Sequence, residues 1–193
     1  MQSDLFTALD PVVSLFIDLN VPWHIGGSVA SSVYGVARTT LDVNLVAGLR
    51  SEHAHQLAAR LEPDYYADEQ MIRGAIQRCG SFNLIHLATM IKIDVFILKA
   101  NTYDQLAMLR TREDTLATGE NARVYRLASA EDVILNKLAW FRAGGEVSER
   151  QWLDVRGVLQ VQQRQLDYDY LEKWAAQLGV TDLLRRAIAG ANP

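Results

Sequence analysis

The sequence predicts an α+β protein, in which a small mixed sheet with flanking helices is followed by a C-terminal helical region. Two observations lead to this class. Before residue 128, short apolar segments typical of strands alternate with segments of helical spacing. From Ser129 onward, every segment has helical spacing. We therefore expect two domains, an α/β core over residues 1–128 and a helical domain over residues 129–193.

The α/β core is expected to begin with an amphipathic helix over residues 4–19, in which Pro11 either opens the second half or causes a kink. Gly26-Gly27 makes a turn, and Ser28 is placed to cap the next helix. Apolar residues alternate after Ala88-Thr89, which indicates a hairpin there. The other elements expected are strands over 23–25 and 41–46, helices over 29–36, 52–61 and 68–77, strands over 82–87 and 90–97, a helix over 103–109, and weak strands near 115 and 124–125.

Four helices are expected in the C-terminal domain, each marked by apolar residues at helical spacing. The first ends at Gly144-Gly145, because glycine commonly follows the last turn of a helix. Ser148 opens a capping-box pattern that begins the second helix. The last two helices are expected over residues 170–178 and 181–189.

Composition limits the classes of partner and compartment. A formal net charge of −4 gives no general attraction to nucleic acid or to an anionic membrane. The single cysteine, Cys79, excludes an internal disulfide, fits a reducing compartment, and is expected to be a small buried side chain. No segment approaches the roughly 20 apolar residues that span a bilayer, and the N-terminus lacks a signal-peptide pattern. We therefore expect a soluble cytoplasmic protein with no membrane partner.

The segment Gly26-Gly27-Ser28 lies between an expected strand and an expected helix. A glycine turn that leads into a helix offers a phosphate both backbone N–H groups and the positive end of the helix dipole. Glycine turns and serine caps are also common where no ligand binds, so this segment alone does not decide the function. Arg38 follows the next helix and either contacts a phosphate or caps a strand.

Asp42 and Asn44 lie two residues apart on one expected strand, and Lys92 and Asp94 repeat this spacing on another. Residues at such spacing share one face of a strand. If the strands are neighbours in register, Asp42, Asn44 and Asp94 converge, with Lys92 nearby. Two carboxylates and an amide oxygen suit Mg²⁺ bound to nucleotide phosphates. The alternatives are edge charges that discourage aggregation and, for Lys92, a solvated surface side chain.

Lys137 and Asp154 lie in the first two helices expected in the C-terminal domain. Lys137 is on or beside the face that should pack, so its ammonium group either extends to solvent or meets an anion. Asp154 has Arg150 and Arg156 as near neighbours in sequence, and an ordinary surface ion pair is the default interpretation.

Taken in this order, these residues resemble the nucleotidyltransferase superfamily and, more narrowly, the AbiEii-type toxins of abortive-infection and toxin–antitoxin systems. The matching elements are Gly27-Ser28, Arg38-Thr39-Thr40-Leu41-Asp42, Lys92-Ile93-Asp94, Lys137 and Asp154. The resemblance covers most of the chain and implies a nucleotidyltransferase-like mixed sheet. It also implies transfer of a nucleoside monophosphate from an NTP to RNA, protein or a small hydroxylated molecule. Mg²⁺ or Mn²⁺ would be the cofactor, and an antitoxin would be a protein partner.

The resemblance implies a role for each group of residues. The nucleotide would be bound by Gly26, Gly27, Ser28, Arg38 and Lys92. The metal would be held by Asp42, Asn44 and Asp94. The catalytic residues would be Asp42, Asp94, Lys137 and Asp154. Within that set, Asp94 would hold metal or activate the acceptor hydroxyl, and Asp154 would orient Lys137 toward the phosphates.

Asn44 stands where the family usually has a second carboxylate. An amide oxygen can coordinate Mg²⁺ but carries no charge. At about 4 Å and an effective dielectric near 20, the missing charge corresponds to on the order of 4 kcal/mol of attraction. With this departure, and with a C-terminal helical region rich in Leu, Trp and Arg, three hypotheses stand. The chain is an active nucleotidyltransferase, or a weakened or inactive one that binds nucleotide or a partner, or an interaction protein whose C-terminal helices bind a partner.

Overall fold

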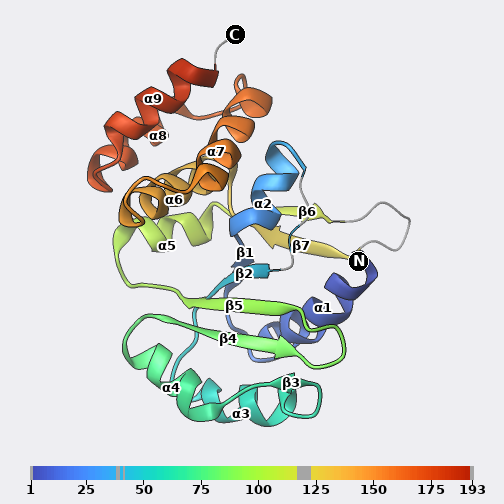
Figure 1. Ribbon diagram of the computed structural model, residues 1–193. Helices are drawn as coiled ribbons and strands as arrows, with labels where there is room; N and C mark the ends of the chain where they lie inside the picture. Colours follow the sequence, from blue (N-terminus) through green and yellow to red (C-terminus); the bar gives the residue numbers. More distant parts are fainter. Residues whose placement is uncertain (1, 38–39, 41, 117–122, 192–193) are drawn as a thin grey trace. The chain divides into compact units, whose positions relative to one another are not determined.

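The computed structural model describes residues 2–37, 40, 42–116 and 123–191 (Figure 1). Helices and a mixed sheet make up these residues, which confirms the predicted α+β class. The chain divides into two compact units, residues 1–25 with 40–127 and residues 26–39 with 128–193. Within the described ranges, no helix combines the length and the apolar character that crossing a membrane requires.

The first unit contains a mixed sheet with the described strands in the order β3-β4-β5-β2-β1-β7-β6. The strands are β1 (Trp23–Ile25), β2 (Asp42–Ala47), β3 (Tyr65–Tyr66), β4 (Ser81–His86), β5 (Lys92–Ile97), β6 (Arg112–Thr115) and β7 (Val124–Leu127). β2 runs parallel to β5, and β1 runs parallel to β7, whereas the other neighbours are antiparallel. β4 and β5 form the predicted hairpin. The sequence prediction lacks β3, because two residues are too few to show an alternating pattern.

Helix α1 (Gln2–Asp18) bonds to two strands of the first unit through tyrosine hydroxyls. The Tyr65 hydroxyl on β3 donates a hydrogen bond of 2.7 Å to the Ala8 carbonyl. The Tyr125 hydroxyl on β7 donates one of 2.6 Å to the Asp10 carboxylate. Because β3 and β7 lie far apart in the strand order, these two bonds attach α1 to strands near opposite edges of the sheet. Pro11 lies inside α1. The other helices of this unit are α3 (His53–Leu61), α4 (Glu69–Gln77) and α5 (Thr102–Leu109).

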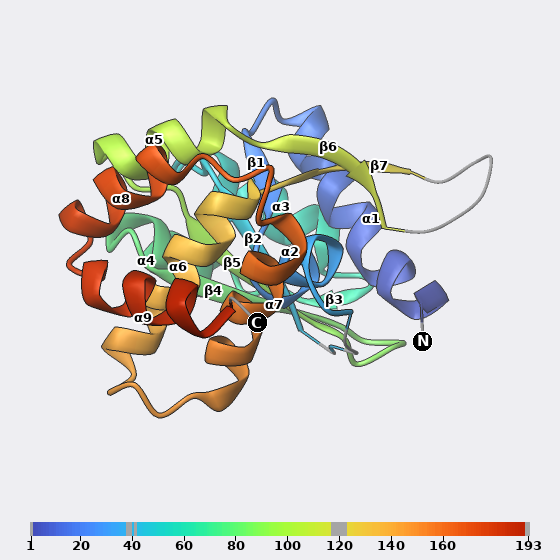
Figure 2. The same cartoon turned by 90° about the horizontal axis from the view of Figure 1, so that it is seen from above.

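The second unit consists of helices. They are α2 (Gly27–Tyr34), α6 (Ala130–Ala143), α7 (Glu149–Gln162), α8 (Tyr168–Gln177) and α9 (Thr181–Ala191). α6 and α7 lie side by side in both views (Figures 1 and 2). α2 packs on α7 with little room between the two backbones, since a Cβ atom added to Gly35 would lie 2.8 Å from the Val158 nitrogen. The Gln162 amide also donates a hydrogen bond of 2.9 Å to the Tyr34 carbonyl.

Three local predictions differ from the structure. Ser28 does not cap α2, because Gly26 occupies the cap position and Ser28 lies in the first turn of the helix. Cys79 is exposed instead of buried, because it follows the end of α4 at a φ of +48°, in the turn that leads to β4. Ser148 precedes α7 as predicted, but its side chain makes no capping hydrogen bond.

A buried carboxylate fixes the start of α6 and supplies a test of packing in the helical unit. Asp132 is 0% exposed and accepts hydrogen bonds from the Ser129 hydroxyl at 2.7 Å and the Tyr170 hydroxyl at 2.8 Å. Tyr170→Phe is expected to lower the free energy of unfolding by about 1–3 kcal/mol, because the carboxylate loses a donor and stays buried. Urea unfolding measures this. Tyr168→Phe is the matched control, since that hydroxyl bonds at the surface, and an equal loss in both variants would contradict the account.

Candidate active site

The central strands of the first unit bury one face and present polar side chains on the other. On the buried face, Val43 and Leu45 of β2 and Ile93 of β5 are 0% exposed. Residues between them along each strand leave the opposite face, because side chains alternate. The face opposite Val43, Leu45 and Ile93 therefore holds the polar residues of β2 and β5 that the sequence analysis named.

The register between β2 and β5 brings these polar residues together. Asp42 lies opposite Lys92, and Asn44 lies opposite Asp94. The predicted convergence of Asp42, Asn44 and Asp94, with Lys92 nearby, is confirmed. Because neighbouring strands are about 5 Å apart, side chains paired in this way are within reach of one another.

Lys92 is held between the two carboxylates. Its ammonium nitrogen lies 3.0 Å from Asp94 Oδ2 and 4.0 Å from Asp42 Oδ1. The hydrogen bond to Asp94 raises the pKa of Lys92 above its ordinary value, against a smaller lowering by partial burial. The Asp94 side chain is 19% exposed, compared with 56% for Asp42. Lys92 is thus a charged partner of both carboxylates and not an isolated surface side chain.

Asn83 on β4 also belongs to this face, although the sequence interpretation assigned it no role. β4 is antiparallel to β5 and places Asn83 opposite Asp94. Asp94 therefore has an amide-bearing residue on each side, Asn44 on β2 and Asn83 on β4. The alternation of polar and apolar residues over Ser81, Phe82, Asn83 and Leu84 was the available signal. We call Asp42, Asn44, Asn83, Lys92 and Asp94 the polar cluster.

The glycine turn belongs to the second unit, where it begins α2. Gly27 has a φ of +57°, in the left-handed region that favours glycine, and it is the first residue of the helix. A Cβ atom added to Gly26 would meet no atom of the described structure within 4 Å. The turn thus combines open space with the amide end of a helix, which are the properties expected of a phosphate site. Arg38, the other predicted phosphate contact in this region, lies outside the described residues.

Lys137 and Asp154 form a buried ion pair in the second unit. Lys137 Nζ on α6 lies 2.7 Å from Asp154 Oδ2 on α7, and the side chains are 9% and 7% exposed. The contact expected from the resemblance is present. Two sequence interpretations are wrong, namely that Lys137 extends to solvent and that Asp154 forms an ordinary surface pair. The packing of α6 on α7 encloses both groups. That either residue acts on a nucleotide, together with the polar cluster, stays a prediction.

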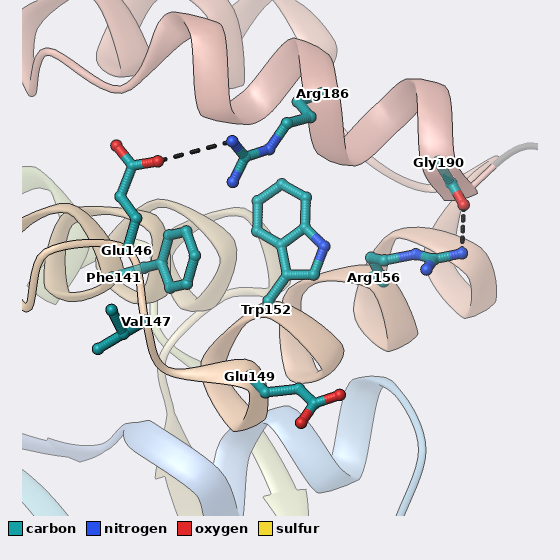
Figure 3. Close-up of a pocket in the computed structure, with 8 residues that line it drawn as sticks. All are labelled: Phe141, Glu146, Val147, Glu149, Trp152, Arg156, Arg186 and Gly190. Atoms are coloured by element: carbon teal, nitrogen blue, oxygen red, sulfur yellow. Dashed lines mark hydrogen bonds and ion pairs between the residues drawn. The ribbon is translucent and has the colours of Figure 1, made fainter.

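A separate hollow of about 490 Å³ lies within the helical unit (Figure 3). The Arg186 guanidinium on α9 stacks over the Trp152 ring on α7, 4.3 Å from its centroid. Arg186 also lies 3.6 Å from the Glu146 carboxylate, which follows α6. These contacts connect α9 to α6 and α7. Among the residues that the structure describes, none of the predicted site residues lines this hollow.

Comparison with known proteins supplies a fold but no sequence family. No protein-family model matches the chain, and no curated protein matches it. The solution structure of the antibiotic-resistance factor ANT(2'')-Ia is similar with a TM-score of 0.56 and 16% identity, over 98% of this chain and 96% of that one. An antigenic nucleotidyltransferase-like protein from Paracoccidioides brasiliensis is similar with a TM-score of 0.50 and 15% identity, over 94% and 91%. The fold is nucleotidyltransferase-like.

A nucleotidyltransferase-like fold, together with the sequence resemblance, raises the question of whether the polar cluster fits a divalent cation. Asp42, Asn44 and Asp94 supply carboxylate and amide oxygens on one face, the donors that Mg²⁺ prefers. The described residues contain no group of three or more Asp, Glu, His or Cys side chains that could hold a metal ion. The donor set therefore fits one cation with the Asn44 amide as a third ligand.

Proposed function

We propose that the chain is a metal-dependent nucleotidyltransferase that transfers a nucleoside monophosphate from an NTP to an acceptor hydroxyl. The observation that carries this proposal is the register of β2 and β5, which places Asp42, Asn44 and Asp94 on one face beside Lys92. The nucleotidyltransferase-like fold supports it, because the cluster lies on the sheet of that fold.

In the proposed reaction, the acceptor oxygen bonds to the α-phosphorus, the bond from that phosphorus to the β-phosphate oxygen breaks, and pyrophosphate leaves. A divalent cation bound by Asp42, Asn44 and Asp94 would supply neutralisation of phosphate charge. Asp94 would also accept the hydroxyl proton, because carboxylates serve as general bases when they reach the acceptor. Lys92 would pair with phosphate oxygens once a nucleotide is bound.

The second unit would contribute groups that bind phosphate. The turn at Gly26, Gly27 and Ser28 offers backbone N–H groups at the start of α2. Lys137 would contact nucleotide phosphates, and Asp154 would orient it through their 2.7 Å contact. Arg38 is proposed as a further phosphate ligand on the basis of the sequence resemblance.

Besides RNA and protein, a small hydroxylated molecule is a proposed acceptor. The crystal structure of ANT(2'')-Ia in complex with adenylyl-2''-tobramycin is similar to this chain with a TM-score of 0.56 and 15% identity, over 91% of this chain and 97% of that one. That complex holds an adenylylated small molecule, which motivates the same acceptor class here. The narrower AbiEii-type role, with an RNA or protein acceptor and an antitoxin partner, is supported by the Lys92-Ile93-Asp94 motif and the Lys137–Asp154 pair.

A second candidate is a nucleotide-binding protein with weak or no turnover. Two observations favour it, namely the neutral Asn44 at a position where a carboxylate is expected, and the ammonium of Lys92 between Asp42 and Asp94. Such a protein would be stabilised by NTP against heat without forming pyrophosphate. The gain in its free energy of unfolding would rise as the NTP concentration increases relative to the Kd for NTP.

The test is incubation with each of the four α-phosphate-labelled NTPs, Mg²⁺ or Mn²⁺, and a cell extract divided into RNA, protein and small molecules. We expect one fraction to become labelled, and Asp42→Ala to abolish the labelling because the cluster loses a carboxylate. Label in RNA or protein would favour the AbiEii-type role, and label in small molecules would favour the other acceptor class. NTP-induced stabilisation with no label in any fraction would instead favour the binding protein.

A further inference from the structure

The polar cluster contains its own cation. Two carboxylates and one ammonium leave it with one net negative charge, and the remaining members, Asn44 and Asn83, are neutral. The ammonium lies 3.0 Å from Asp94 and 4.0 Å from Asp42, within the distances of an ion pair. The two carboxylates that a divalent cation would require are therefore already the partners of Lys92.

We propose that Lys92 is a tethered competitor of the divalent cation and sets the metal affinity of the polar cluster. The inference rests on the proposed function, which makes a divalent metal ion the ligand of this cluster. The observation behind it is the position of the Lys92 ammonium. When a cation binds to Asp42 and Asp94, Lys92 must give up both partners, and like-charge repulsion opposes the binding of the cation as long as the ammonium stays nearby.

The type of side chain suits this exchange. A lysine carries a compact point charge on a flexible four-carbon stem, whereas an arginine would form a planar two-point contact that is harder to release. The Lys92 side chain is 39% exposed, so it has solvent into which the ammonium can move. The phosphate groups of a bound nucleotide would offer the displaced ammonium an alternative partner.

The test is direct Mn²⁺ binding, measured by electron paramagnetic resonance of free Mn²⁺ without nucleotide. Lys92→Met is expected to lower the Kd for Mn²⁺ by about tenfold or more, because two carboxylates become available and a positive charge is removed. Lys99→Met is the matched control, since it removes one exposed lysine shortly after the same strand. Its Kd is expected to equal that of the unmodified chain.

Two further variants keep the test decisive. Asn44→Asp is expected to tighten Mn²⁺ binding even with Lys92 present, because it adds a charge at the third ligand. Lys92→Gln, a polar replacement, serves if Lys92→Met does not fold by circular dichroism. An unchanged or higher Kd in the folded Lys92 variant, or no Mn²⁺ binding in any variant, would overturn the proposal. Tighter Mn²⁺ binding without any nucleotidyl transfer would support the competition and count against the proposed function alone.

Discussion

Replacement of Asp94 by alanine is expected to lower the rate of nucleotidyl transfer by on the order of a thousandfold. Asp94 is the best-enclosed carboxylate of the polar cluster, with its side chain 19% exposed, and it faces Asn44 and Asn83 on the two adjacent strands. The variant removes a proposed metal ligand and the proposed general base at once. Steady-state release of pyrophosphate measures the effect.

Two variants define the cause of this loss. Asp94→Asn keeps an oxygen donor but removes the charge, so a loss as large as that of Asp94→Ala would show that the charge is required. Glu113→Ala removes an exposed carboxylate from β6 of the same sheet and is expected to leave the rate unchanged. If Asp94→Ala retained more than about a tenth of the rate while folded, Asp94 would not be a catalytic residue.

Replacement of Lys137 by methionine is expected to lower the free energy of unfolding by about 3–5 kcal/mol, because the buried Asp154 carboxylate would lose its lysine partner. The pair is buried on both sides, with side chains 9% and 7% exposed and a contact of 2.7 Å. Urea unfolding followed by circular dichroism gives the value. Asp182→Ala in the same unit breaks an exposed pair with Arg142 and is expected to have a far smaller effect.

The double variant Lys137→Met/Asp154→Leu separates stability from function. Replacing both charges with apolar groups is expected to recover most of the lost stability, since a buried ion pair is often no better than an apolar contact. If the pair serves the nucleotide, this stable variant would still have lost transfer activity. Full activity in the double variant would limit the pair to a structural role.

The local elements could be predicted from the sequence wherever the apolar pattern was long enough. Trp23–Ile25 is a strand at the predicted residues, and the hairpin formed by β4 and β5 has the predicted strands. β3 could not be found in this way because it has two residues. Cys79 is exposed because a turn after α4, and not the composition of its segment, decides its environment.

Four of the five residues of the polar cluster could be singled out from the sequence, but their meeting, and the fifth residue, required the sheet. The spacing of Asp42 with Asn44, and of Lys92 with Asp94, showed that each pair shares a face. Only the register between β2 and β5 shows that the pairs meet, and strand pairing is a tertiary property that one strand's sequence does not contain. Asn83 enters through the register of β4, for the same reason.

The most direct test of the central claim compares transfer of label from an NTP carrying it on the α-phosphate with transfer from one carrying it on the γ-phosphate. The account predicts that the acceptor gains the α label and that the γ label is recovered in pyrophosphate. With Asp42→Ala or Asp94→Ala, neither labelled product is expected to form. Transfer of the γ label to the acceptor, or undiminished transfer of the α label by both folded variants, would contradict the assignment of nucleotidyl transfer to the polar cluster.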